Sequence, residues 1–175
     1  MPLSTLLQLF DSAPGGFLPA GDYEPGLVLL SVLVAVVSAF MALQLAVRAR
    51  HAPSRLLRGA ALSAGSVTLG AGVWAMHFIG MLAYQLCAEI RYDAWITALS
   101  MLPAMAAAWV ALTSLARPFS GGWRLLGSGV LMGAGIGLMH YGGMAAVMSR
   151  ASLRYDPAWF AASIVVAVVL AVLAL

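Results

Sequence analysis

Charged residues are scarce in this sequence of 175 residues: Asp, Glu, Lys and Arg together make up 9%, against roughly 25% in soluble globular domains. It has no lysine-rich or acidic run that would solvate a surface. Hydrophobic residues make up 63%, and the mean hydropathy is +0.98. Apolar stretches recur at lengths near the ~20 residues that a helix needs to cross a bilayer. The composition therefore excludes an ordinary soluble domain and predicts one membrane domain in contact with the lipid bilayer.

Other absences exclude further classes of protein. A single cysteine, Cys87, rules out an intrachain disulfide framework and a multi-cysteine metal site. No basic patch with interleaved aromatic residues occurs, so we expect no nucleic-acid partner. The sequence also has no Ser/His/Asp constellation, phosphate loop or paired buried carboxylates, and we expect no enzymatic activity of this chain. Residues 1–22 lack the positive start of a signal peptide and are predicted to form an exposed arm, with a short amphipathic helix at 3–10.

Apolar runs between charged or Pro/Gly breaks predict an all-α bundle of about five transmembrane helices. The predicted spans are residues 26–47, 57–84, 94–116, 124–148 and 158–175. Pro103 removes one helix hydrogen bond from the third span, so we expect a kink there.

The arginines predict the orientation of the bundle. They cluster in the first and third loops between spans, at Arg48, Arg50, Arg55, Arg58, Arg117 and Arg124. The opposite loops mix arginine with acidic residues, and the N-terminal arm is acidic. By the positive-inside rule the arginine-rich loops are cytoplasmic, and the N-terminus lies outside.

A repeat with an offset of 63 residues organises the chain. Residues 69–93 align without a gap on residues 132–156, and twelve of these 25 positions are identical. Shared motifs are Gly-Ala-Gly, Met-His, Gly-Met and Arg-Tyr-Asp. Tyr23, Tyr92 and Tyr155 each stand eight residues before a serine, so a Tyr-led helix occurs three times. The repeat predicts a bundle of helix hairpins, and we expect the natural protein to continue with a sixth helix carrying a third His motif.

Each of two predicted spans carries one histidine, His77 or His140. An ionisable residue inside an apolar span is rare and marks a functional site by default. Residues four apart share a helix face, so His77 is expected beside Met81 and His140 beside Met144. The glycine-rich rows before each histidine allow helices to approach closely. The repeat therefore predicts that both histidines lie at one depth in the outer part of the membrane, on faces that meet.

Imidazole and thioether groups without carboxylates favour copper, Cu(I) especially, over Mg, Ca or Mn. Three alternatives stay open. Two histidines also suit haem b as axial ligands, for sensing or electron transfer. They also suit a metal-handling transporter, although transport would need a polar path through the bilayer, and the inner halves of the spans are Ala, Leu, Val and Gly. The histidines also suit a purely structural hydrogen bond between helices.

The segments Met-His-Phe-Ile-Gly-Met at 76–81 and Met-His-Tyr-Gly-Gly-Met at 139–144 each follow a glycine-rich helix and precede Arg-Tyr-Asp. In this pattern residues 23–175 resemble the MHYT family of bacterial membrane sensor domains. The first motif departs from the family at Phe78 and Ile79, and the second at Gly142.

The resemblance implies a multi-pass sensor in the bacterial inner membrane, with a copper site near the periplasmic face that senses a diatomic gas (O₂, NO or CO) or redox state. It also implies an attached cytoplasmic output domain of cyclic di-GMP signalling, of the GGDEF or EAL type. The oligomeric state stays open, with a homodimer as one alternative. By resemblance, the metal ligands are His77, His140, Met81, Met144, Met76 and Met139.

Overall fold

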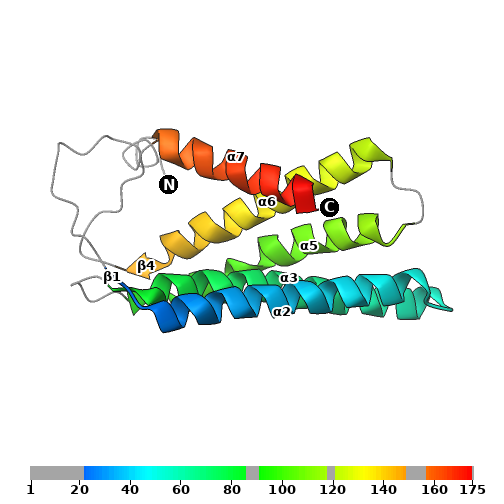
Figure 1. Cartoon of the computed structure of the whole chain (residues 1–175), viewed down its shortest axis with the longest axis horizontal. Coiled ribbons are helices and arrows are strands. Elements are labelled where there is room, and N and C mark those ends of the chain that lie inside the picture. Colours follow the sequence, from blue (N-terminus) through cyan, green and yellow to red (C-terminus); the bar gives the residue numbers. More distant parts are fainter. Residues whose placement is uncertain (1–21, 86–90, 118–120, 149–156, 175) are drawn as a thin grey trace.

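The computed structural model describes residues 22–85, 91–117, 121–148 and 157–174 as a bundle of long helices lying along a common axis (Figure 1). The helices are α2 (Pro25–Arg50), α3 (Arg55–Ala83), α4 (Ala94–Leu99), α5 (Met101–Leu115), α6 (Gly122–Ala145) and α7 (Pro157–Ala174). Within these ranges five helical segments are long and apolar enough to cross a membrane, because α4 and α5 form one span of 22 residues. The predicted all-α membrane bundle is confirmed. The predicted helix at 3–10, Cys87 and the second Arg-Tyr-Asp lie outside the described residues.

Local sequence explains where the helices begin and break. The Ser54 hydroxyl accepts a hydrogen bond from the Leu57 N–H at 3.2 Å and caps α3. The Asp93 carboxylate caps α4 by accepting from two backbone N–H groups, each at 2.9 Å. The third span is interrupted at Ser100, one turn before Pro103, because proline offers no N–H to the preceding turn. Regular helix is thus interrupted between α4 and α5, and a kink of the span at this place stays a prediction.

Short strand pairs at one end of the bundle repeat the same connection twice. β1 (Asp22–Tyr23) pairs antiparallel with β2 (Tyr84–Gln85), and β3 (Arg91–Tyr92) pairs antiparallel with β4 (Val147–Met148). Two backbone hydrogen bonds extend these pairs, from Glu24 N to the Ala83 carbonyl at 2.9 Å and from Asp93 N to the Ala146 carbonyl at 2.8 Å. Because residues 84 and 147–148 are used in strands, α3 and α6 end slightly before the predicted spans do.

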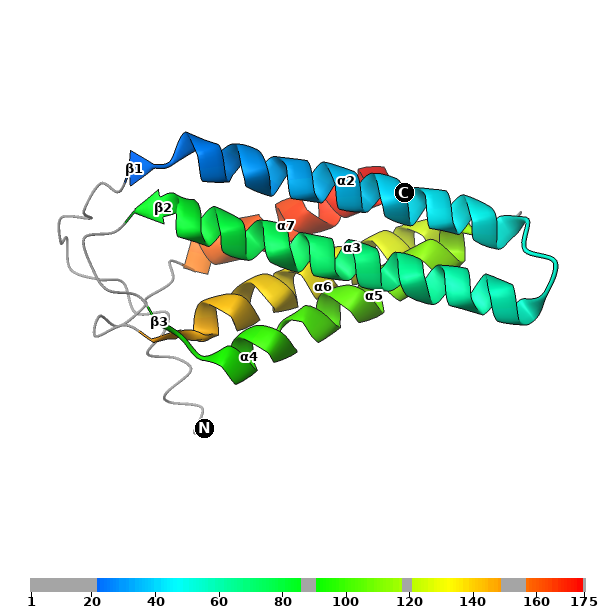
Figure 2. The same ribbon diagram turned by 90° about the horizontal axis from the view of Figure 1, so that it is seen from below.

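Glycines set the spacing between helices that follow one another, which pack in the order α2, α3, α5, α6, α7 (Figures 1 and 2). A Cβ on Gly70 of α3 would lie 2.6 Å from the Met105 Cα on α5, and one on Gly133 of α6 would lie 2.5 Å from the Val168 Cα on α7. Gly70 and Gly133 are 63 residues apart, and so are Met105 and Val168, which is the offset of the repeat. The repeat in the sequence is therefore a repeat of backbone contacts.

The next shared glycine in each motif packs against the helix before it. Gly72 faces the Ser38 side chain on α2, and Gly135 faces Ala107 on α5, with no room for a Cβ at either glycine. Each of α3 and α6 is thus held closely on two sides. The remaining core is made largely of small side chains, and Ala42, Ala104 and Ala108 are fully buried.

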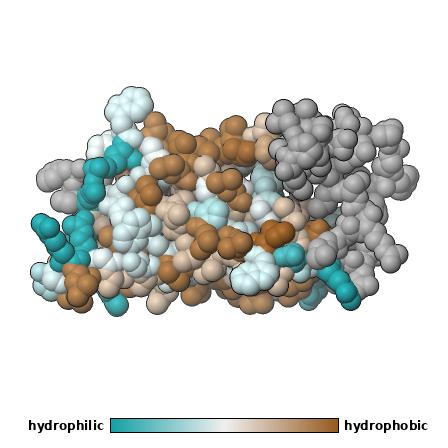
Figure 3. All heavy atoms as spheres, turned by 180° about the vertical axis from the view of Figure 1, so that it is seen from behind, coloured by the Kyte–Doolittle hydropathy of each residue, from teal (hydrophilic) through white to brown (hydrophobic). Residues whose placement is uncertain are grey.

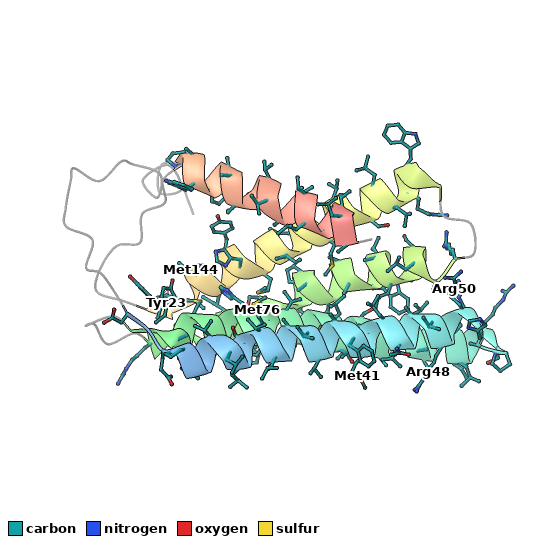
Figure 4. The ribbon with its side chains drawn as sticks, viewed as in Figure 1. Tyr23, Met41, Arg48, Arg50, Met76 and Met144 are labelled. Carbon is teal, nitrogen blue, oxygen red and sulfur yellow. The ribbon has the colours of Figure 1, made fainter. Side chains whose placement is uncertain are left out.

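The two ends of the bundle differ in charge. Arg48 and Arg50 lie at the end opposite Tyr23 (Figure 4). Hydrophobic side chains cover the middle of the face in Figure 3, and hydrophilic ones gather at its edges. Large apolar side chains such as Phe40 and Val165 are 60% exposed, as expected for residues that contact lipid. This chain is a multi-pass membrane protein; that the arginine end faces the cytoplasm stays a prediction.

Candidate metal centre

The two repeated histidines meet inside the bundle. His77 on α3 and His140 on α6 place their Nδ1 atoms 3.3 Å apart, with ring centroids at 4.7 Å and ring planes at 68°. Each ring lies less than two turns from the end of its helix, at the end that carries the strand pairs. The structure thus brings together the residues that the repeat predicted to converge, while their role as ligands stays a prediction.

Gly143 provides the surface on which the His77 ring rests. A Cβ at residue 143 would lie 2.9 Å from His77 Nε2 and 3.1 Å from Phe78 Cζ, so only glycine leaves room for the ring in this position. Gly80, its equivalent in the first motif, has nothing within 4 Å of a Cβ. The two motifs are identical at this position in sequence but have different surroundings, which makes the histidine pair asymmetric.

The polar atoms of the pair are incompletely satisfied. His77 Nε2 is buried and has no hydrogen-bond partner among the described residues. The two Nδ1 atoms face each other, and two imidazole nitrogens in that position either share one proton or accept a common cation. A buried polar atom without a partner costs about 1–3 kcal/mol. The two facing Nδ1 atoms thus have the capacity to share a cation, whereas His77 Nε2 lies against Gly143.

Two cavities border the histidine pair, and Met76 lines both. The end cavity, of about 480 Å³, lies beside the strand pairs and is also lined by Met81 and Met144. The side cavity, of about 290 Å³, lies between α3, α6 and α7 and is also lined by Met139. Figure 4 shows Met76 and Met144 at the same end of the bundle as Tyr23. All four predicted methionines thus border a cavity that the histidines border.

Sulfur ligands would be needed for a metal at this place. The described residues contain no group of three or more His, Cys, Asp or Glu side chains that could hold a metal ion. Two imidazoles alone leave a metal ion with too few ligands, since protein sites usually supply three or four. The arrangement therefore suits a soft ion that accepts thioether sulfur.

Two tyrosines of the end cavity, Tyr23 and Tyr92, were not predicted as site residues, because nothing in the sequence pattern brings them to the histidines. Tyr84 was expected near the face of His77, with packing as its role. Tyr23, Tyr84 and Tyr92 all line the end cavity, and Tyr23 packs on Tyr84 with ring centroids 4.9 Å apart. Burial raises the pKa of Tyr92, so its phenol stays protonated at neutral pH. The signal in the sequence was the repeat of Tyr23 at Tyr92, next to strands that pair with the ends of the His-bearing helices.

Hydrogen bonds join the His-bearing helices to the Tyr-led helices. The Trp74 indole N–H on α3 donates to the Thr97 carbonyl at 2.9 Å and to the Ser100 hydroxyl at 3.2 Å. On α6, the Tyr141 and Ser163 hydroxyls are 2.6 Å apart. Ser100 and Ser163 are the repeated serines that follow the tyrosines by eight residues. These bonds hold the helices on which the rings sit.

Comparison with known families decides what the repeat belongs to. The family model described as "MHYT: Bacterial signalling protein N terminal repeat" matches residues 19–59, 70–128 and 133–175. The chain belongs to the MHYT family. The resemblance found in the sequence is therefore confirmed, and each of the five membrane spans of this MHYT domain lies at least in part within a matched segment.

Relatives of this MHYT domain are long signalling proteins. It is 38% identical over 151 residues to the bifunctional diguanylate cyclase/cyclic di-GMP phosphodiesterase MucR of Pseudomonas aeruginosa, covering 85% of this chain and 22% of the relative. It is 40% identical over 148 residues to the cyclic di-GMP phosphodiesterase NbdA of the same species, covering 83% and 18%. The signaling protein YkoW of Bacillus subtilis is 32% identical over 146 residues, with the same two coverages. No solved structure matches the chain.

The chain spans about a fifth of the length of these relatives. The enzymatic activities in their names belong to the whole proteins, and the MHYT match identifies this chain as a membrane sensor domain of signalling proteins.

Proposed function

We propose that this MHYT domain binds one copper ion through His77 and His140, with methionine sulfur completing the site, at the periplasmic end of a bundle in the bacterial inner membrane. Occupation of the site, its redox state or the binding of a diatomic gas such as O₂, NO or CO changes the packing of α3 against α6. That change is passed to a cytoplasmic output domain of cyclic di-GMP signalling in the parent protein. The 3.3 Å approach of two imidazole nitrogens carried by different helices is the observation on which the proposal rests.

The separation of the two Nδ1 atoms suits a single shared ion. Imidazole nitrogen binds first-row transition-metal ions at about 2.0 Å, so two nitrogens on one tetrahedral ion lie about 3.3 Å apart. The Nδ1 atoms of His77 and His140 have that separation. Neutral imidazole is both the form that binds metal and the form tolerated in an apolar membrane interior.

The methionines give the site its preference among metals. Met76 borders both cavities beside the rings, Met81 and Met144 border the end cavity, and Met139 borders the side cavity. Thioether sulfur is a soft ligand, which favours Cu(I) over hard ions. A bound cuprous ion would supply a soft centre able to bind a diatomic gas.

Haem b fits the same residues less well. Two axial histidines lie on opposite faces of the macrocycle and point at an iron between them. Here the ring centroids are 4.7 Å apart and the rings are in direct contact, so a haem would require α3 and α6 to separate. The short distance between the two rings therefore favours a single metal ion over haem b.

Transmission follows from the helices that carry the ligands. α3 and α6 run from the histidine pair to the arginine end, where an output domain would attach (Figure 1). A ligand shifts the packing equilibrium only by its differential affinity for the two arrangements of these helices. MucR and NbdA, both named for cyclic di-GMP enzymes, support an output domain of this class in the parent protein.

Copper content of purified protein tests the proposal. We expect about one copper per chain in the wild type and in His51→Ala, because His51 is exposed at the arginine end. We expect copper to be lost from both His77→Ala and His140→Ala, since either change leaves a single imidazole. Copper retained in both of these variants would overturn the proposed site, and a Soret band in protein from haem-supplied cells would favour haem b instead.

A further inference from the structure

Each His-bearing helix is bonded to the Tyr-led helix that follows it through a serine hydroxyl. Ser100 donates to the Thr97 carbonyl at 2.7 Å, and Ser163 donates to the Phe160 carbonyl at 2.8 Å. The two serines are equivalent in the repeat, and so are the two residues whose carbonyls accept. A hydroxyl has one hydrogen to donate, so each serine oxygen is left to accept a hydrogen bond from the His-bearing helix.

Different residues donate this hydrogen bond in the two repeats. In the second repeat the donor is Tyr141, whose hydroxyl lies 2.6 Å from that of Ser163. In the first repeat the equivalent residue is Phe78, which has no hydroxyl, and the Trp74 indole N–H donates to Ser100 at 3.2 Å instead. The position equivalent to Trp74 in the second repeat is glycine. Two differences between the repeats thus compensate each other, and the hydrogen bond to the serine is kept.

The aromatic ring that follows each histidine packs against the imidazole. Phe78 lies edge-on to His77, with ring centroids 5.1 Å apart and planes at 72°, and Tyr141 lies edge-on to His140 at 4.9 Å and 80°. Tyr141 is fixed to its serine directly. Phe78 is fixed through Trp74, whose ring centroid lies 4.9 Å from its own. In both repeats a chain of contacts therefore runs from the serine of the Tyr-led helix to the histidine ring.

The position of Phe78 bears directly on the His77 ring. Both side chains lie over the same glycine, because a Cβ on Gly143 would meet His77 Nε2 at 2.9 Å and Phe78 Cζ at 3.1 Å. A phenylalanine side chain has several staggered rotamers, and its neighbours select among them. Trp74 is held by two hydrogen bonds to the next helix. The fixed indole therefore selects the position of Phe78, and Phe78 in turn limits where the imidazole can lie.

We propose that Trp74 is a positioning residue of the metal centre. It donates the hydrogen bond that tyrosine donates in the second repeat, and through Phe78 it keeps the His77 ring at the distance from His140 that one shared ion requires. The effect on copper binding rests on the proposed function. The effect on the His77 ring does not, because the ring position can be measured without metal.

Copper affinity of three variants tests the proposal. We expect Trp74→Ala to lower Cu(I) affinity by about tenfold, because the displaced imidazole leaves the geometry that a binding site tolerates. Adding Phe78→Tyr supplies the hydroxyl that the second repeat uses and should restore the affinity to within about twofold of the wild type. Trp74→Phe, which keeps a ring but loses the N–H, should give an intermediate loss and guards against misfolding of the alanine variant. Trp95→Ala is the matched control, since Trp95 is 78% exposed, and it should bind copper like the wild type.

Side-chain NMR of histidine-labelled, metal-free protein reports the ring position itself. We expect the His77 signals to shift or broaden in Trp74→Ala and to return when Phe78→Tyr is added. The His51 signals should stay the same in every variant, because His51 is exposed at the arginine end.

Unchanged copper affinity in folded Trp74→Ala and Trp74→Phe would overturn the positioning role and leave the proposed function standing. A loss of affinity that Phe78→Tyr does not restore would overturn it too, since it would mean that Trp74 contributes only packing. If the wild type binds no copper, the proposed function fails, while the His77 signals still decide whether Trp74 positions the ring.

Discussion

Gly143 is the residue whose substitution tests the histidine pair without touching a ligand. In Gly143→Ala the new methyl would lie 2.9 Å from His77 Nε2 and 3.1 Å from Phe78 Cζ. Ordinary contacts between such atoms are about 3.5 Å, so the imidazole must retreat by about 0.6 Å. A binding constellation tolerates roughly 0.5 Å of displacement. We therefore expect copper affinity to fall by about tenfold or more, equivalent to ~1.4 kcal/mol.

The stability of this variant should fall by no more than about 2 kcal/mol. Overpacking costs about 1–3 kcal/mol, and replacing glycine by alanine inside a helix returns up to ~1 kcal/mol. The repeat supplies the control, because a methyl at Gly80 would have nothing within 4 Å. Gly80→Ala should bind copper within about twofold of the wild type and be slightly more stable.

Competition titration with a Cu(I) chelator measures the affinities of the three proteins, and thermal unfolding in detergent measures their stabilities. Equal copper affinity in Gly143→Ala and Gly80→Ala would contradict the account, since it would mean that the position of the His77 ring does not matter for binding. A loss in both variants would point to the motif backbone instead of the ring.

The remaining predictions concern the contacts that hold the helices. Gly72→Ala directs a methyl onto the Ser38 side chain and should lower the free energy of unfolding by about 2 kcal/mol. Adding Ser38→Gly to this variant should restore the thermal midpoint, and a failure to restore it would argue against this contact. Arg58 donates to the Ala116 carbonyl, the C-cap of α5, at 3.2 Å, so Arg58→Ala should lower the free energy of unfolding by about 1 kcal/mol. Arg55 is exposed, and Arg55→Ala serves as the control in the same assay. Equal losses in the two variants would assign the effect to charge alone. Tyr141→Phe removes a hydrogen bond to α7 and should cost about 1 kcal/mol without reducing copper content, which elemental analysis checks.

The fold was predictable because the bilayer leaves few choices. Apolar runs of the right length can only be helices there, and the five predicted spans agree with the observed ones within a few residues at most ends. The repeat also predicted that His77 and His140 meet, but not which glycine allows it: Gly70 and Gly133 pack α3 on α5 and α6 on α7, and Gly143 makes room for the His77 ring.

Other features depend on tertiary contacts that the sequence pattern does not contain. Gly80 and Gly143 are identical in the motif, but a histidine ring lies against Gly143 while nothing lies within 4 Å of a Cβ on Gly80. Tyr23 and Tyr92 stand at the ends of predicted spans, where tyrosine usually belongs to an aromatic belt at the membrane surface. The pairing of β1 with β2 and of β3 with β4 brings them to the end cavity instead.

X-ray absorption at the copper edge tests the central claim most directly, which is that both imidazoles bind one ion. The account predicts two imidazole nitrogens per copper at about 2.0 Å in the wild type. It predicts one nitrogen or none, with loss of copper, in His77→Ala and in His140→Ala. A copper spectrum that is the same in the wild type and in either variant would contradict it.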